Sequence, residues 1–434
     1  MDFKDVLNIV LSTFEIEWKN ANEFERANLL ERQKKAILGD ELSVAEYKDK
    51  ISEILNLNNM REESFPSYYK NINDAVFNEL YGLAGLAPWV YDETEEYKES
   101  QSAKLIGDRL YCLIDGKSIL QPQRITKERR EQLKRAFLLS SPKERIEKGF
   151  HEVYLFNGIR VTIYSGDRTK EGQDVMVFRK YLIKDYSFEK FVELGTIPEE
   201  SVELFKIMVK IGFNVIFTGP VRSGKTTFMQ TWQRFEDEKL EGVAIATDPE
   251  TPWHEIMPNA PIMQIVCDGN DLENISKSIM RGDNDYIILE EMRDAISMNL
   301  ALEITSIGTR RTKATAHAND ARELPRRMAE KIRIKYGGNE KEIENRILRN
   351  YSYVFLFNQV ETNRAKKKLV SLSEYSFDEK TGGEITEIIR FDAVNNRWIW
   401  KYHLSDDNRN IGMDFPDEMR KMEEILKEME LKND

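Results

Sequence analysis

Eight consecutive residues, Gly219 to Thr226, have the composition and spacing of a phosphate-binding loop. They read Gly-Pro-Val-Arg-Ser-Gly-Lys-Thr and fit the pattern G-x-x-x-x-G-K-[ST] at every position. In such loops backbone N–H groups face phosphate oxygens, the lysine reaches the β- and γ-phosphates, and the last hydroxyl binds Mg²⁺. The pattern therefore predicts a site for ATP and Mg²⁺ formed by Gly219, Pro220, Val221, Arg222, Ser223, Gly224, Lys225, Thr226 and Thr227.

The alternative interpretation of these eight residues is a chance match in a glycine-containing turn. The flanking segments argue against it. Asn214 to Thr218 is a short apolar run typical of a buried strand, and Thr226 to Met229 resembles the start of a helix. A helix that starts directly after the loop adds further N–H donors to an anion site. Loops of this pattern bind phosphate when a strand precedes them and a helix follows them, as expected here.

Two acids close a second apolar run, in the form of a Walker B element. Tyr286 to Leu289 is apolar, and Glu290 and Glu291 follow it. Because adjacent side chains on a strand point in opposite directions, we assign the acids different roles. Glu290 is expected to hold Mg²⁺, directly or through water, and Glu291 to activate the attacking water. A solvated acidic strand end is the alternative.

Other candidates are weaker when taken singly. Asp248 and Glu250 follow an apolar strand at 243–246, where ligands bind in open α/β sheets, although an ordinary turn fits nearly as well. His317 stands in a run of small residues, and alone it favours a structural histidine. Arg160 and Arg179 lie on expected strands; arginine suits a γ-phosphate, yet the pattern alone indicates ordinary sheet-face residues.

The elements that must position these residues fall into four regions. We expect a helical N-terminal extension over residues 1–72, an α+β domain with a mostly antiparallel sheet over 73–185, a linker over 186–200, and a P-loop ATPase domain over 201–434 that ends in a helix. Gly39 interrupts the extension, and Ser43 opens an apparent capping box. Asn157-Gly158 indicates a hairpin in the α+β domain. Short apolar strands alternating with helices predict a parallel, doubly wound sheet in the last region.

Composition limits the class of protein. The chain has 434 residues, 41% hydrophobic and 32% charged, with a net charge of −12. This acidic balance argues against a protein whose main task is to grip nucleic acid. The two cysteines give no disulfide framework and no zinc pattern, which favours a reducing, cytoplasmic setting. We find no secretory signal and no run long enough to span a bilayer.

Taken together, these segments resemble the secretion-ATPase superfamily, the hexameric motors of type II and type IV secretion and of type IV pili. The resemblance covers roughly residues 75–360 and favours the branch of conjugation traffic ATPases and tight-adherence pilus ATPases. It rests on an ordered set of boxes: the phosphate loop, Asp248-Pro249-Glu250 as the Asp box, 285–294 as Walker B, and Thr315-Ala316-His317-Ala318-Asn319 as the His box.

The resemblance implies a fold and roles for particular residues. The fold is α/β: a RecA-like doubly wound C-terminal ATPase domain preceded by a smaller α+β, PAS-like domain and the helical extension. Lys225 and Thr226 would hold phosphates and Mg²⁺, and Glu291 resembles the catalytic glutamate. His317 would sense the state of the nucleotide. Arg160 and Arg179 would reach the nucleotide from the N-terminal domain.

The resemblance also implies partners and a location. The chain would form a homohexamer and act on an inner-membrane platform or coupling protein, from the cytoplasm at the inner face of the membrane, with no direct contact to nucleic acid. Three positions depart from the family pattern: Arg222 replaces a small residue, Glu290 replaces a glycine, and Thr247-Asp248 stands where the Asp box opens with Glu. A motor stimulated by nucleic acid and a non-enzymatic adaptor that binds nucleotide are the alternative functions.

Overall fold

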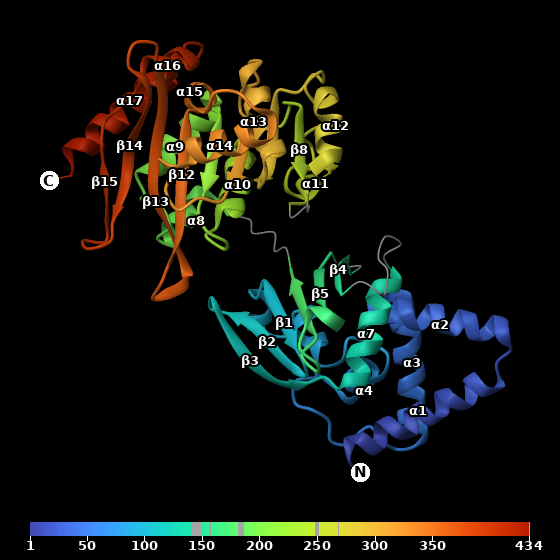
Figure 1. Cartoon of the computed structure of the whole chain (residues 1–434). Helices are drawn as coiled ribbons and strands as arrows, with labels where there is room; N and C mark the ends of the chain where they lie inside the picture. The colour runs from blue at the N-terminus through green and yellow to red at the C-terminus, as the bar shows by residue number, and fades with distance from the viewer. Residues whose placement is uncertain (141–148, 156–157, 181–185, 248–250, 268, 434) are drawn as a thin grey trace. The chain divides into compact units, whose positions relative to one another are not determined.

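The chain folds into two compact units. The computed structural model describes residues 1–140, 149–155, 158–180, 186–247, 251–267 and 269–433. The first unit is Met1–Leu182 and the second is Ile183–Asp434 (Figure 1). Among the helices of the described ranges, none is both long and apolar enough to cross a bilayer.

The first unit begins with helices whose buried residues form mostly a core of their own, whereas Ile37 and Leu38 join the second core, which contains the sheet. Gly39 ends the second helix in a left-handed conformation, with φ 95°, as the sequence indicates. The capping box expected at Ser43 is wrong by three residues, because Asp40 is the cap and accepts a hydrogen bond from the Ser43 N–H. The helices are α1 (Phe3–Asn20), α2 (Glu23–Leu38), α3 (Glu41–Leu57), α4 (Ile72–Leu80), α5 (Ala87–Val90), α6 (Glu95–Lys98) and α7 (Lys127–Ser140).

A six-stranded sheet completes the first unit, in the order β3-β2-β1-β6-β5-β4. Every neighbouring pair is antiparallel, as predicted for this region. The expected hairpin joins β4 and β5, although Asn157 itself lies outside the described residues. The strands are β1 (Ser102–Ile106), β2 (Arg109–Ile114), β3 (Lys117–Arg124), β4 (Phe150–Tyr154), β5 (Arg160–Tyr164) and β6 (Val175–Arg179).

The second unit is built on a nine-stranded sheet, in the order β15-β14-β13-β12-β7-β11-β10-β8-β9. From β12 to β9 all neighbours are parallel, and β13, β14 and β15 extend the sheet with antiparallel pairs. The strands are β7 (Val215–Thr218), β8 (Gly242–Ala246), β9 (Ile262–Val266), β10 (Tyr286–Met292), β11 (Lys313–Ala316), β12 (Tyr353–Val360), β13 (Asn363–Asp378), β14 (Gly382–Asp392) and β15 (Arg397–Trp400).

Helices cover both faces of this sheet, which confirms the predicted α/β, doubly wound class. One core packs α9, α10 and α17 on the sheet, and the other packs α13, α14 and α15 on the opposite face (Figure 1). The helices are α8 (Phe188–Glu193), α9 (Ser201–Ile211), α10 (Lys225–Arg234), α11 (Trp253–Ile256), α12 (Gly269–Ile279), α13 (Ala295–Ser306), α14 (Leu324–Tyr336), α15 (Glu340–Asn350), α16 (Asp406–Ile411) and α17 (Pro416–Leu431).

The segment expected as a linker, 186–200, contributes to this second unit. It contains α8, whose Phe188 and Phe191 are buried in the core beside α9 and α10. Phe188 stacks on Phe235 with ring centroids 4.7 Å apart. The segment therefore packs as part of the sheet-and-helix unit.

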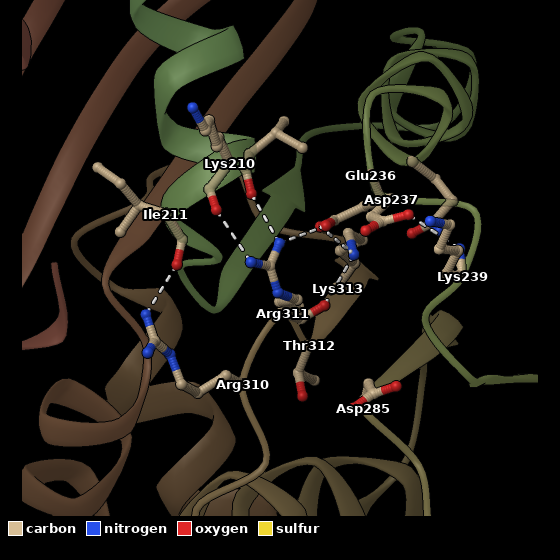
Figure 2. A network of polar contacts seen from close by, with 12 residues as sticks. Lys210, Ile211, Glu236, Asp237, Lys239, Asp285, Arg310, Arg311, Thr312 and Lys313 are labelled. Carbon is tan, nitrogen blue, oxygen red and sulfur yellow. Dashed lines mark hydrogen bonds and ion pairs between the residues drawn. The ribbon is translucent and has the colours of Figure 1, made fainter. Parts of the chain in front are cut away.

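A buried ionic network lies at the amino end of β11 (Figure 2). Lys313 Nζ is 2.8 Å from one carboxylate oxygen of Glu236, and Arg311 Nη1 is 2.5 Å from the other. The side chains of Lys313 and Glu236 are 0% and 1% exposed. Burial lowers the pKa of Lys313, and the Glu236 carboxylate opposes that shift. The charges can persist there because they are paired.

The basic pair Arg310-Arg311 also caps a helix. Arg311 donates to the carbonyl oxygens of Val209 and Lys210 at the end of α9. Arg310 donates to the carbonyl oxygen of Ile211, at 2.7 Å (Figure 2). The last turn of a helix leaves carbonyls without partners, so these arginines satisfy them.

Candidate functional site

The phosphate-loop sequence forms the turn between β7 and α10, as predicted. Gly219 has φ 141°, and a Cβ at this position would lie 2.1 Å from the carbonyl oxygen of Phe357 on β12. Gly224 has φ 92° and precedes the first residue of α10. Any side chain at 219 would collide with backbone, and residue 224 needs a left-handed conformation. The two glycines of the pattern are thus required by the geometry of the turn.

The interior of the loop offers polar groups suited to phosphate. Ser223 is fully buried, and within the described part of the chain its hydroxyl has no hydrogen-bond partner. A buried hydroxyl without a partner costs free energy unless a ligand satisfies it. Lys225 Nζ donates to the carbonyl oxygen of Pro220, at 3.0 Å, within the same loop. These features fit a bound polyphosphate.

Glu291 is held between two cationic or hydrogen-bonding side chains. His317 Nε2 lies 2.8 Å from one Glu291 oxygen, and Arg293 Nη2 lies 2.5 Å from the other. Burial acts to raise the pKa of Glu291, but the hydrogen bonds from His317 and Arg293 outweigh it and lower the pKa to about 2. Glu291 is therefore ionised at neutral pH and able to accept a proton.

His317 connects the phosphate loop to Glu291. Its Nδ1 lies 3.1 Å from the carbonyl oxygen of Gly219 and 3.4 Å from Lys225 Nζ, while its Nε2 faces Glu291. Strands β7, β10 and β11 are parallel neighbours, so their carboxyl ends meet at one edge of the sheet. The structure thus brings together Lys225, His317 and Glu291, which the sequence placed on three separate segments.

Glu290 lies on the same strand as Glu291 but in different surroundings. Strand β10 continues to Met292, so both acids belong to it. Glu290 is 6% exposed, and one of its carboxylate oxygens accepts a 2.9 Å hydrogen bond from Trp253 Nε1. By alternation it shares the face of Tyr286 and Ile288, whose core also contains α10.

The described residues offer few protein ligands to a metal. Within the described ranges, no three or more His, Cys, Asp or Glu side chains form a group that could hold a metal ion. Mg²⁺ at nucleotide sites uses one or two side chains together with phosphates and water. Thr226, in the first turn of α10, and Glu290 have the ligand chemistry for this role, and their assignment stays a prediction.

The remaining predicted residues are placed as follows. Asp248 and Glu250 lie outside the described residues. Arg160 and Arg179 belong to the first unit, where they are direct cross-strand partners on β5 and β6. Arg160 is 9% exposed and pairs with Glu152 at 2.5 Å. Their contact with nucleotide stays a prediction.

Three contacts of the site were not anticipated from the sequence. The sequence pattern includes Arg293 only as part of the Walker B segment and predicts no role for Trp253. The third is Gln359 on β12, whose Nε2 donates to the carbonyl oxygen of Arg222, at 2.9 Å. Arg222 has φ 65°, an uncommon conformation for a residue other than glycine. Gln359 is far from the loop in sequence, so no local spacing signalled the contact.

Comparisons with known proteins agree with the sequence resemblance. Residues 170–347 match the family model described as type II/IV secretion system protein. An uncharacterised protein of Bacillus anthracis is 21% identical over 222 residues, 51% of this chain and 48% of its own length. The competence protein ComGA of Bacillus subtilis is 25% identical over 173 residues, 38% of this chain and 45% of its own.

The chain thus matches about half the length of these curated relatives. Among solved structures, the pilus retraction motor PilT with bound ADP is similar with a TM-score of 0.47 and 16% identity, over 76% of this chain and 88% of that one. Residues 170–347 thus match the family of type II/IV secretion system proteins.

Proposed function

We propose that this protein hydrolyses MgATP to ADP and phosphate. One observation carries the proposal: a continuous line of contacts joins the phosphate-loop lysine to an ionised glutamate. Lys225 Nζ is 3.4 Å from His317, and His317 is 2.8 Å from Glu291. A cation for the phosphates and a base for the attacking water are thus held at one edge of the sheet.

The side chains have distinct roles in this proposal. Lys225, which donates to Pro220 within the loop, would bind the β- and γ-phosphates. Glu291 would accept the proton of the attacking water while Arg293 and His317 keep it ionised and oriented. Mg²⁺, held through Thr226 and Glu290, would offset the negative charge of the phosphates.

We also propose that hydrolysis drives a secretion or pilus machine. The match of residues 170–347 to type II/IV secretion system proteins supports this, and a homohexamer working on an inner-membrane platform or coupling protein is the assembly that the sequence resemblance suggests. Arg160 and Arg179 would then reach the nucleotide from the first unit, and Asp248 and Glu250 would take part in nucleotide binding. Hydrolysis would release the nucleotide from these arginines and so allow one unit to move against the other.

A motor stimulated by nucleic acid is the alternative. It needs exposed basic clusters, and the Arg310-Arg311 pair is engaged instead with α9 carbonyls and Glu236. The net charge of −12 points the same way. Hydrolysis measured with and without DNA separates the two, since strong stimulation by DNA would favour the alternative.

The primary test is Lys225→Ala, assayed for phosphate release from MgATP by the purified full-length protein. Loss of the cation should abolish measurable turnover and weaken MgADP binding. Lys341→Ala is the matched control, because Lys341 is an exposed lysine of α15 that pairs with its helix neighbour Glu344. Equal turnover by the Lys225→Ala variant and the parent would refute the proposed site.

A further inference from the structure

The hairpin of β12 and β13 packs against the phosphate loop. Gln359 on β12 donates to the Arg222 carbonyl, and Gln359 is the direct cross-strand partner of Lys367 on β13. Directly opposed residues of an antiparallel pair lie on the same face. The face of the hairpin that carries Gln359 and Lys367 is therefore the one turned toward the loop.

A second contact places Lys367 itself on the loop. A Cβ built on Gly224 would lie 3.5 Å from Cγ and 3.9 Å from Cβ of Lys367. These are ordinary van der Waals distances, so the lysine stem covers the glycine that precedes Lys225. Lys367 is half-buried, whereas Lys366 beside it is exposed.

The stem of Lys367 lies on the loop, and its ammonium group binds the hairpin itself. Its Nζ donates to the carbonyl oxygen of Arg364 on the same hairpin. A lysine ammonium has three donors on a flexible four-carbon stem, so it can turn from this carbonyl or keep it while gaining a new acceptor. An anionic ligand in the loop would supply that acceptor.

We propose that Lys367 is a second cation for the phosphates of the bound nucleotide, supplied by the β12–β13 hairpin from outside the phosphate-loop motif. The inference rests on the proposed function, because it assumes that the loop binds a nucleoside di- or triphosphate. It goes further by giving the hairpin a direct part in binding. The ligand it recognises is the polyphosphate, and not the base.

The test compares Lys367→Met with Lys366→Met in equilibrium binding of MgATP, MgADP and adenosine to the full-length protein, measured by calorimetry. Methionine keeps most of the stem that covers Gly224 and removes the charge. Loss of one charge-assisted hydrogen bond should weaken MgATP and MgADP binding about tenfold and leave adenosine binding unchanged. Lys366→Met should bind all three as the parent does, and Lys367→Arg should retain most of the affinity.

The outcomes separate the two proposals. If the parent protein binds no MgATP, the proposed function fails and the role of Lys367 fails with it. If the parent binds but Lys367→Met binds equally well, only the role of Lys367 is overturned. A loss that is as large for adenosine as for MgATP would also overturn it, because that result would mean that the hairpin merely supports the shape of the loop. A shallower dependence of MgATP affinity on salt in Lys367→Met would support the charge assignment.

Discussion

The two ends of strand β11 carry polar clusters of similar chemistry in opposite environments. At its amino end Lys313 and Glu236 are 0% and 1% exposed. Just beyond its carboxyl end, His317 and its partner Glu291 are 41% and 26% exposed. The buried cluster is paired within the protein and closed to ligands, whereas the open one can exchange partners. We infer that the first fixes the strand and that the second does chemistry.

The largest expected effect is on turnover, from Glu291→Gln at the open end. Glutamine keeps the size of the side chain and its hydrogen bond to Arg293 or His317, but it cannot take a proton from water. The rate of ATP hydrolysis should fall by about 10²–10⁴-fold, with MgADP affinity retained. Phosphate release and calorimetry measure the two quantities.

Glu303→Gln is the control for this substitution, because Glu303 is a half-exposed acid of α13 paired with Arg346 at 3.0 Å. It should leave turnover unchanged. Parental turnover in Glu291→Gln would mean that another group activates the water. The cluster at the carboxyl end of β11 would then not differ from the buried cluster by a catalytic role of Glu291.

The next effect is on stability, from Lys313→Ala at the closed end. Removing the lysine leaves Glu236 buried with one partner fewer, which should lower the free energy of unfolding of the second unit by about 3–5 kcal/mol. Urea unfolding monitored by hydrogen exchange of peptides from β10 and β11 measures the unfolding free energy of the second unit alone. Lys313→Met combined with Glu236→Gln should recover much of the loss.

Arg293→Ala is the matched substitution at the open end, since it also removes a cation from a glutamate. Arg293 is 51% exposed, so stability should change by less than about 1 kcal/mol. Equal losses from Lys313→Ala and Arg293→Ala would show that burial does not distinguish the two clusters.

The smallest effect concerns an intermediate cluster, where His403 Nδ1 lies 3.0 Å from a carboxylate oxygen of fully buried Glu374. The hydrogen bond to Glu374 raises the pKa of His403, against the effect of burial. The folded pKa exceeds the unfolded value of about 6.5. The pair therefore contributes its full stability below about pH 6.5 and loses it as pH rises through the folded pKa.

Because His403 is partly exposed, the loss should be about 1 kcal/mol or less. Unfolding free energies at pH 5.5 and pH 8.5 should differ more in the parent than in His403→Gln. Glu374 stays ionised across this range, because hydrogen bonds from His403, Ser405 and Asn408 outweigh burial and lower its pKa. If the unfolding free energy changes equally between pH 5.5 and pH 8.5 in both proteins, the His403–Glu374 pair does not contribute pH-dependent stability.

Local patterns predicted the elements whose signals are short-range. The loop between β7 and α10, the parallel strands and the antiparallel first unit follow from motif spacing and hydrophobic periodicity. The misplaced cap of α3 shows the limit of such signals: Asp40 and Ser43 are both acceptable caps in sequence, and only the backbone geometry chooses Asp40.

Contacts between distant segments could not be predicted in the same way. The pairing of Arg311 and Lys313 with Glu236 joins residues that have no motif between them. The same holds for Trp253 with Glu290 and for Gln359 with the Arg222 carbonyl. Each depends on which strands become neighbours in the sheet, and periodicity along the chain carries no such information.

The position of β12 limits how this protein can be divided. The recognised family segment ends at residue 347, yet β12 begins at Tyr353 and is hydrogen-bonded alongside β7, the strand that leads into Gly219. A fragment trimmed to the recognised segment would lack β12, leave the central strand β7 with one open flank and uncover Phe217, which is fully buried and packs on Phe355. Such an unpaired edge invites pairing with other chains. Expression trials should therefore retain everything through β15 and α17, since shorter versions are expected to aggregate even though the recognised segment is intact.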